Sequence, residues 1–233
     1  MADNDNIHIV PEMRRISGIH FVGIGGVGMC GIAEVLANQG YAISGSDIKE
    51  SAVVERLRGL GVRVEIGHRA ENIDGADVVV TSTAVTTENE EVAEAHARRI
   101  PVVPRAQMLA ELMRFRHGIA VAGTHGKTTT TSLTGWLLTH GQLDPTVLVG
   151  GIALNFGDRG SSYRLGGGRD FVIEGDEYDS AYFDKTAKYL KYLPDIAVIN
   201  NIEFDHVDIY ADLDAVRLAF RRLVNLVPRN GML

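Results

Sequence analysis

The chain is poor in several kinds of residue, and each shortage excludes a class of protein. Its 233 residues include a single cysteine, Cys30, so an internal disulfide framework is excluded and a reducing compartment is expected. No apolar run approaches the length of a membrane-spanning helix. Residues 1–11 are polar and acidic, without the basic flank and apolar core of a signal peptide. We therefore expect a cytoplasmic protein without a membrane partner.

Basic residues are outnumbered by acidic ones, 23 to 30. The formal net charge is −7, which gives no electrostatic support for a nucleic-acid partner. The remaining composition, 45% apolar and 23% charged, is that of an ordinary globular protein. The length suits one large domain or two of ordinary size.

A glycine-rich turn near the middle of the chain carries the clearest functional signal. Residues 118–122 read as a buried strand and residues 128–140 as a helix, and the turn between them would expose backbone N–H groups that attract phosphate. Lys127 is placed to reach the outer phosphates of a nucleoside triphosphate, and the Thr128 hydroxyl to bind Mg²⁺. The turn is shorter than the strict P-loop, which has glycine where this chain has Val121. The alternative is an ordinary strand–helix turn with a surface lysine. The residues predicted to bind ATP are Gly123, Thr124, His125, Gly126, Lys127, Thr128 and Thr129.

A second glycine-rich turn lies upstream. Gly23, Gly25 and Gly28 form the pattern G-x-G-x-x-G between a predicted strand and a predicted helix, and Asp47 follows the next strand. These are the parts of a dinucleotide-binding fingerprint, in which the glycines admit phosphate and the acid binds a ribose hydroxyl. A tight packing turn without a ligand is the alternative.

Strands alternate with helices throughout this half, which predicts a parallel sheet covered on both faces. We expect strands at 19–24, 41–44, 63–66, 77–81 and 101–104, and helices at 29–39, 53–60, 88–99 and 106–113. His68, Ser82, Thr83 and Ala84 follow strands of this series, at the carboxyl ends where open α/β sheets bind ligands. For His68, a solvated loop histidine is an equal alternative.

Acidic residues follow the phosphate loop. Glu174 ends the apolar strand 171–174 and is placed to hold Mg²⁺ beside the triphosphate. Asp176, Glu177 and Asp179 come next, as a mixture of supporting groups and solvated loop charges.

A histidine follows the next strand. His206 lies between Asp205 and Asp208 after strand 196–200, where an imidazole can bind a second metal or contact the transferring phosphate. A helix is expected at 213–227, and residues 231–233 read as the start of another strand.

Because each glycine-rich turn opens its own series of strands and helices, we predict two domains, 1–114 and 115–233. The segment 154–169, rich in Gly, Ser and Arg, is expected to form one long loop.

Taken together, these motifs resemble the Mur ligases, the ATP-dependent amide-forming enzymes of bacterial peptidoglycan synthesis. The resemblance is carried by residues 19–34 (IHFVGIGGVGMCGIAE), 99–117 and the phosphate loop, and it covers nearly the whole chain. It implies an α/β fold in which an N-terminal Rossmann-like domain is followed by a P-loop-type ATPase domain. The C-terminal domain of the family is expected to be missing, so the chain alone would turn over poorly.

The resemblance also implies ligands and roles. The first glycine-rich turn would hold the UDP part of UDP-N-acetylmuramate and no nicotinamide. Lys127, Glu174 and His206 would be catalytic, with Thr128 and Glu174 on one Mg²⁺ and His206 on a second. The UDP-sugar would contact Gly25, Gly26, Gly28, Met29, Ser46, Asp47, His68, Ser82, Thr83 and Ala84.

The acceptor amine is left open by the resemblance. The front of the chain is similar to family members that add L-alanine through an acyl phosphate. Residues 174–185 and 200–210 are more similar to members that attach the tripeptide L-Ala-γ-D-Glu-meso-diaminopimelate in cell-wall recycling. A nicotinamide oxidoreductase and a non-catalytic nucleotide-binding module are alternatives from other classes. A homodimer stays open beside a monomer.

Overall fold

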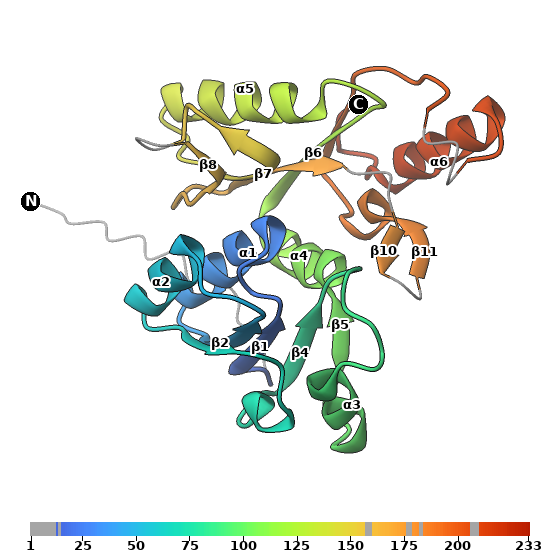
Figure 1. The fold of residues 1–233 in the computed structure, drawn as a ribbon. Coiled ribbons are helices and arrows are strands. Elements are labelled where there is room, and N and C mark those ends of the chain that lie inside the picture. Colours follow the sequence, from blue (N-terminus) through green and yellow to red (C-terminus); the bar gives the residue numbers. More distant parts are fainter. Residues whose placement is uncertain (1–12, 14, 157–159, 176–178, 182–183, 206–209) are drawn as a thin grey trace, which may run out of the picture.

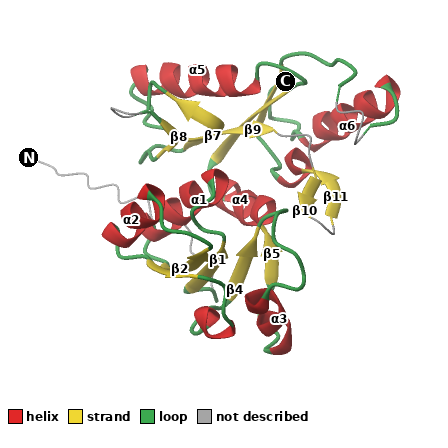
Figure 2. Cartoon of the chain, in the orientation of Figure 1, coloured by secondary structure: helices red, strands yellow, loops and turns green. Residues whose placement is uncertain are grey.

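Two sheets, one from each half of the chain, dominate the computed structural model (Figure 1). The structure describes residues 13, 15–156, 160–175, 179–181, 184–205 and 210–233. Both halves have the predicted α/β character, with helices packed on the faces of mainly parallel sheets (Figure 2).

The N-terminal sheet is parallel throughout, as the alternation of strands and helices predicted. Its order is β3-β2-β1-β4-β5, so the strand order reverses between β1 and β4, and open α/β sheets bind ligands at such a switch point. The strands are β1 (Gly18–Val22), β2 (Ala42–Asp47), β3 (Arg63–Ile66), β4 (Val78–Thr81) and β5 (Val102–Pro104). The helices are α1 (Val27–Asn38), α2 (Ala52–Gly59), η1 (Ala70–Ile73), α3 (Glu90–Ala97) and α4 (Arg105–Arg114).

The second sheet has the order β12-β6-β9-β7-β8 and is parallel except for β8, which runs antiparallel to β7. Its strands are β6 (His117–Ala122), β7 (Thr146–Ala153), β8 (Ser161–Arg164), β9 (Asp170–Gly175) and β12 (Ile196–Ile199). The remaining elements are α5 (Lys127–His140), β10 (Asp179–Ala181), β11 (Asp184–Ala187), η2 (Lys188–Lys191) and α6 (Leu213–Leu226).

The prediction of one long loop over 154–169 was wrong, because this segment contains β8. The strand begins after Gly160, which adopts φ 73°. Its sequence, SSYR, lacks the apolar alternation that marks most strands. β8 is an edge strand, and its register with β7 is interrupted. Near the end of the chain, Met232 bridges to Ile196 in parallel, where a further strand was predicted to start.

Helices α1 and α4 lie between the two sheets and join them (Figures 1 and 2). One continuous apolar cluster includes residues of both helices and of both sheets, among them Phe21, Leu112, Leu148 and Phe171. Gly31 of α1 approaches the second sheet closely, because a Cβ built there would lie 2.9 Å from Leu148 Cδ2. The two sheets therefore share a core.

A polar contact reinforces this junction. Arg56 of α2 donates from Nε to Glu34 Oε1 of α1 at 2.8 Å, and its guanidinium lies 5.4 Å from the centre of the Tyr163 ring on β8. Burial raises the pKa of Glu34, and the neighbouring Arg56 charge opposes that rise.

A buried polar network crosses the N-terminal domain and centres on Glu91 of α3, which is fully buried. Its Oε2 accepts from Ser46 Oγ at 2.6 Å, and its Oε1 accepts from Asn72 Nδ2 at 2.6 Å. His68 Nδ1 lies 3.1 Å from Oε2, and His20 Nε2 lies 3.7 Å from Oε1. The network therefore ties α3 and η1 to β1, β2 and the residues after β3.

The Glu91 carboxylate is held in its ionised form. Burial raises the pKa of Glu91, but His20, Ser46 and Asn72 together lower it to about 2. At 3.7 Å the His20 contact is longer than a hydrogen bond, so we assign its effect to electrostatic attraction.

We expect Gly31→Val to destabilise the chain by roughly 1–3 kcal/mol, because the larger side chain would press on the shared core between α1 and β7. Urea unfolding measures this change. Gly59→Val in α2 is the matched control, since a Cβ at Gly59 meets nothing within 4 Å. Equal stability of the two variants would show that α1 does not pack tightly on the second sheet.

Glu91 should also make the stability of the fold depend on pH. Its pKa falls from 4.5 to about 2 on folding, so the carboxylate stabilises the fold fully above pH 4.5 and progressively less as the pH falls toward 2. The difference in free energy of unfolding between the wild type and Glu91→Gln should therefore shrink across this window. Urea unfolding at a series of pH values measures it, and a constant difference would contradict an ionised Glu91.

Candidate functional site

The first glycine-rich turn leads from β1 into α1 and is fastened to the end of β2. Gly23, at φ 76°, and Ile24 both donate their N–H to the carbonyl of Ser46, at 2.8 and 2.9 Å. Gly25 N–H donates to Asp47 Oδ2 at 2.9 Å. A Cβ at Gly25 would lie 2.8 Å from that carboxylate oxygen, so the close approach requires glycine. The Asp47 carboxylate thus fixes the conformation of the turn by accepting from its backbone.

The start of α1 has the character of an anion site. Gly26 is the N-cap; no side chain among the described residues caps the helix, and its first turn carries no acid. The N-terminal N–H groups of such a helix favour a negative charge.

Arg105 lies beside this helix start, and sequence reasoning missed it. A Cβ built on Gly28 would collide with Arg105 Nη1, so the guanidinium covers that glycine. Arg105 begins α4 directly after β5, at the same edge of the sheet as the glycine turn. Its position immediately after the predicted strand 101–104 was the available signal. A planar guanidinium suits a diphosphate.

Two of the predicted UDP-sugar residues face inward. The Met29 side chain belongs to the apolar core, and the Ser46 hydroxyl is buried against Glu91. His68 stands at the surface end of the polar network, with its side chain 25% exposed and Nδ1 2.9 Å from Ser46 Oγ. Its backbone neighbour Gly67 donates to the Asp47 carbonyl at 2.8 Å, so His68 lies beside the end of β2.

The predicted residues after β4 form a turn at the surface. Val85 N–H donates to the Ser82 carbonyl at 3.2 Å, and Thr83 and Ala84 are exposed. This turn follows the strand next to β1, so it lies at the same edge of the sheet as the first glycine-rich turn.

The second glycine-rich turn joins β6 to α5. Gly126 is the N-cap of α5 at φ 78°, a left-handed conformation that favours glycine. The first turn of α5 carries no acid, and Thr128 and Thr129 are exposed there. Lys127 Nζ folds back onto the loop and donates to the carbonyls of Gly123 and Thr124, at 2.8 and 3.2 Å.

Two asparagines after β12 brace this loop. Asn201 Oδ1 accepts from His125 N–H at 2.8 Å, and Asn200 Nδ2 donates to Thr130 Oγ1 at 3.1 Å. Thr124 N–H donates to the Asn201 carbonyl at 3.2 Å. Both asparagines stand where strand 196–200 was predicted to end, but their contact with the loop depends on β12 pairing with β6.

Glu174 and Thr128 converge on the glycines of β7. Glu174 Oε1 accepts from Gly150 N–H at 2.7 Å, and a Cβ at Gly150 would lie 2.9 Å from Oε2. A Cβ at Gly151 would lie 3.4 Å from Thr128 Cγ2. Glu174 also pairs across the sheet with Val121, just before the phosphate loop.

The carboxylate of Glu174 is a donor that suits Mg²⁺, which usually takes one or two carboxylates and completes its shell with phosphate oxygens and water. Among the described residues no three His, Cys, Asp or Glu side chains form a metal cage. The predicted ligand His206 lies outside the described residues, as do Asp176 and Glu177, and the side chain of Asp179 is not described either. Asp205 is described and lies 4.0 Å from His125 Nε2.

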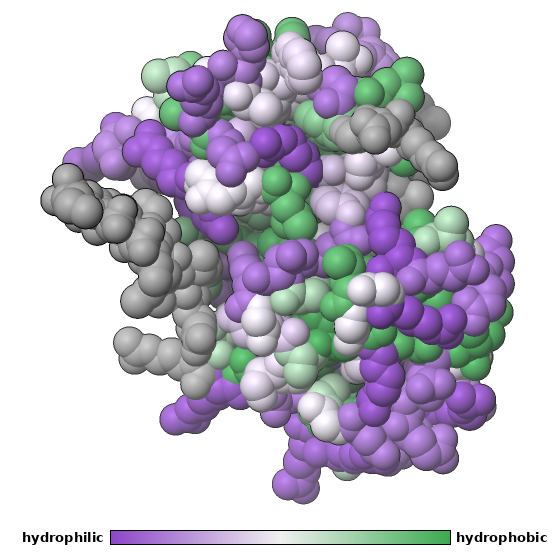
Figure 3. Space-filling view, turned by 90° about the vertical axis from the view of Figure 1, so that its left-hand side faces the viewer, coloured by the Kyte–Doolittle hydropathy of each residue, from purple (hydrophilic) through white to green (hydrophobic). Residues whose placement is uncertain are grey.

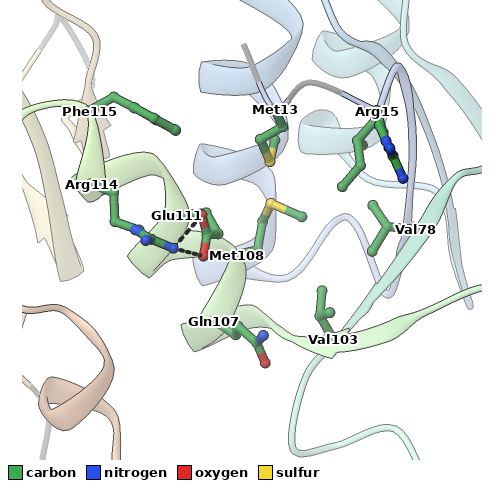
Figure 4. Close-up of a pocket in the computed structure, with 10 residues that line it drawn as sticks. Met13, Arg15, Val78, Val103, Gln107, Met108, Glu111, Arg114 and Phe115 are labelled. Atoms are coloured by element: carbon green, nitrogen blue, oxygen red, sulfur yellow. Dashed lines mark hydrogen bonds and ion pairs between the residues drawn. The ribbon is translucent and has the colours of Figure 1, made fainter. Parts of the chain in front are cut away.

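A separate pocket of about 840 Å³ lies along the later turns of α4 (Figure 4). Met13, Val78, Val103, Met108 and Phe115 give it an apolar lining, and Glu111 and Arg114 form an ion pair beside it. No predicted site residue lines it. It is therefore distinct from the phosphate loops, and Arg105, which covers Gly28, does not line it.

The outer surface shows no large apolar face in the view of Figure 3, where polar and charged residues cover most of the described surface and smaller apolar patches lie among them. Within the described residues, no helix has the length and hydropathy to cross a bilayer.

Comparison with known proteins places both halves in one family. Residues 18–117 match the family model described as "Mur ligase family, catalytic domain", and residues 121–233 match the "Mur ligase middle domain". The UDP-N-acetylmuramate–L-alanine ligase of Legionella pneumophila is 52% identical over 231 residues, which are 99% of this chain and 47% of that protein. The chain thus spans about half the length of the curated relatives it matches.

Solved structures agree. The UDP-N-acetylmuramate:L-alanyl-γ-D-glutamyl-meso-diaminopimelate ligase of Neisseria meningitides matches with a TM-score of 0.83 and 38% identity, over 93% of this chain and 70% of that one. The UDP-N-acetylmuramate–alanine ligase of Thermotoga maritima matches with a TM-score of 0.77 and 32% identity, over 92% of this chain and 48% of that one. The chain therefore belongs to the Mur ligase family.

Proposed function

We propose that this protein joins L-alanine to UDP-N-acetylmuramate, in the cytoplasm, with conversion of ATP to ADP and phosphate. The observation that carries the proposal is a pair of glycine-rich helix starts, each with a positively charged side chain beside it. Arg105 covers the first start and Lys127 belongs to the second. The two sheets share a core, so both helix starts belong to one folded unit. We place a sugar nucleotide at the first start and a triphosphate at the second.

In the proposed reaction, the lactyl carboxylate of the sugar attacks the γ-phosphate of ATP and gives an acyl phosphate and ADP. The amine of the acceptor then attacks the acyl carbon, forms the amide and releases phosphate. Two anions must meet in the first step, so the protein's main contribution is placement and charge neutralisation. Lys127 would leave the loop carbonyls for the phosphates, and the N–H groups at the start of α5 would hold the same oxygens.

Thr128 and Glu174 would hold one Mg²⁺, which would offset the charge on the β- and γ-phosphates. Gly150 N–H positions Glu174 for this role. His206 is proposed as the ligand of a second Mg²⁺.

The acceptor is proposed from relatedness. The 52% identity to an L-alanine ligase extends over 231 residues and so includes the back half, whose motifs looked closer to the tripeptide branch. L-Alanine is therefore the favoured acceptor. The tripeptide stays the second candidate, because the Neisseria tripeptide ligase matches the fold with a TM-score of 0.83. Assaying a full-length protein with both acceptors decides between them.

The two phosphate sites should be separable by mutation. Lys127→Ala should weaken binding of Mg²⁺-ATP to this chain at least roughly tenfold, because a charge-assisted contact is lost, and should leave UDP-N-acetylmuramate binding unchanged. Gly28→Ala should do the reverse, since the added methyl group displaces the Arg105 guanidinium. Titration calorimetry with each ligand measures both effects.

Gly59→Ala is the control for both variants, because a Cβ there meets nothing within 4 Å. If wild-type chain ignores UDP-N-acetylmuramate, or if Gly28→Ala binds it as tightly as wild type does, the assignment of the first site is wrong. Binding of NADH at that site would favour the oxidoreductase instead.

Gly150→Ala should weaken the Mg²⁺ dependence of ATP binding, because the new methyl group would displace the Glu174 carboxylate. Glu174→Ala should have a similar effect, and the double variant should be no worse than either single variant, since both act on one group. Calorimetric titration of ATP with and without Mg²⁺ measures the three. Additive losses would show that Gly150 does not act through Glu174.

A further inference from the structure

The proposed mechanism assigns no role to Glu91, a charged group buried in the N-terminal half. It is fully buried and ionised, and it touches His68, which the sequence placed in the UDP-sugar site. Asn72 and Ser46 use one oxygen each of its carboxylate. The directions of these hydrogen bonds decide where the proton of His68 lies.

Asn72 fixes one end of the network. Its Nδ2 donates to the Gly67 carbonyl at 3.0 Å and to Glu91 Oε1 at 2.6 Å, so both amide protons point at oxygens. Ser46 fixes the other end, because its single hydroxyl proton is donated to Glu91 Oε2 at 2.6 Å. The Ser46 oxygen can therefore only accept from its remaining neighbour, His68.

His68 Nδ1 faces two acceptors. It lies 2.9 Å from Ser46 Oγ and 3.1 Å from Glu91 Oε2, and neither has a proton left to give. A bare Nδ1 would place its lone pair against both oxygens, so Nδ1 must carry the proton. In the neutral ring Nε2 is then a hydrogen-bond acceptor. With Nδ1 held by buried groups and the side chain 25% exposed, Nε2 is on the outward side of the ring.

We propose that Glu91 is a positioning residue of the UDP-sugar site: together with Ser46 it holds the proton on His68 Nδ1 and so presents Nε2 as an acceptor beside the end of β2. The group recognised there is a hydrogen-bond donor on the nucleoside, such as a ribose hydroxyl or the uracil N–H. This assignment of the ligand rests on the proposed function, whereas the proton position rests only on the network.

The variant Glu91→Gln tests the donor and acceptor directions assigned to these hydrogen bonds. Asn72 still requires an oxygen at the Oε1 position, so the new amide nitrogen takes the Oε2 position and faces Ser46 and His68. It donates to Nδ1, the ring proton moves to Nε2, and the outward nitrogen changes from acceptor to donor. Affinity for UDP-N-acetylmuramate should fall roughly tenfold, because a ligand donor then meets a donor.

The tautomer is read from long-range ¹H–¹⁵N spectra of the labelled 233-residue chain, with the His68 signals assigned from His68→Gln. We expect Nδ1–H in the wild type and Nε2–H in Glu91→Gln. Glu90→Gln, the same change at the exposed neighbouring residue, should keep both the wild-type tautomer and the wild-type affinity.

A wild-type chain with the proton on Nε2 overturns the inference, and this measurement does not require Glu91→Gln to fold. A Glu91→Gln chain that unfolds earlier but keeps the Nδ1–H tautomer and full affinity would show that Glu91 only supports the fold. If wild-type His68 is Nδ1–H but the chain does not bind UDP-N-acetylmuramate, the proposed function fails and the proton assignment stands.

Discussion

The first turn of an α-helix leaves backbone N–H groups without partners inside the helix, and much of this molecule is arranged around that constraint. Both α1 and α5 start at glycine, without a side-chain cap or an acid in the first turn among the described residues. Each of these two starts follows a central strand of its sheet, where the carboxyl edge gathers further loops. An anion is the natural partner for such a helix start.

The two starts are completed in different ways. At α1, the turn is fastened by the end of β2, and the cation comes from α4, through Arg105. At α5, the cation is part of the turn itself, and Asn200 and Asn201 brace the loop from the neighbouring strand.

The buried carboxylate of Glu91 is surrounded by hydrogen-bonding side chains. Glu91 would be costly without partners, since burying a lone charge is strongly unfavourable. Ser46, Asn72 and His68 supply those partners and tie helix α3 to the end of the sheet where a ligand would bind. The same network thus stabilises the fold and orients a surface histidine.

The sequence by itself determined the alternating elements of the N-terminal half and both glycine-rich turns, because hydrophobic period and glycine spacing are local properties of the chain. The tertiary structure decided what those turns face. Arg105 reaches Gly28 only because β5 and β1 both flank β4, and Ser46 meets Glu91 across 45 residues of chain. Edge strand β8 was not predicted for a related reason. Its sequence lacks the apolar pattern that a strand usually shows, and its pairing with β7 is a tertiary contact. Contacts of this kind depend on strand order, which no short stretch of residues encodes.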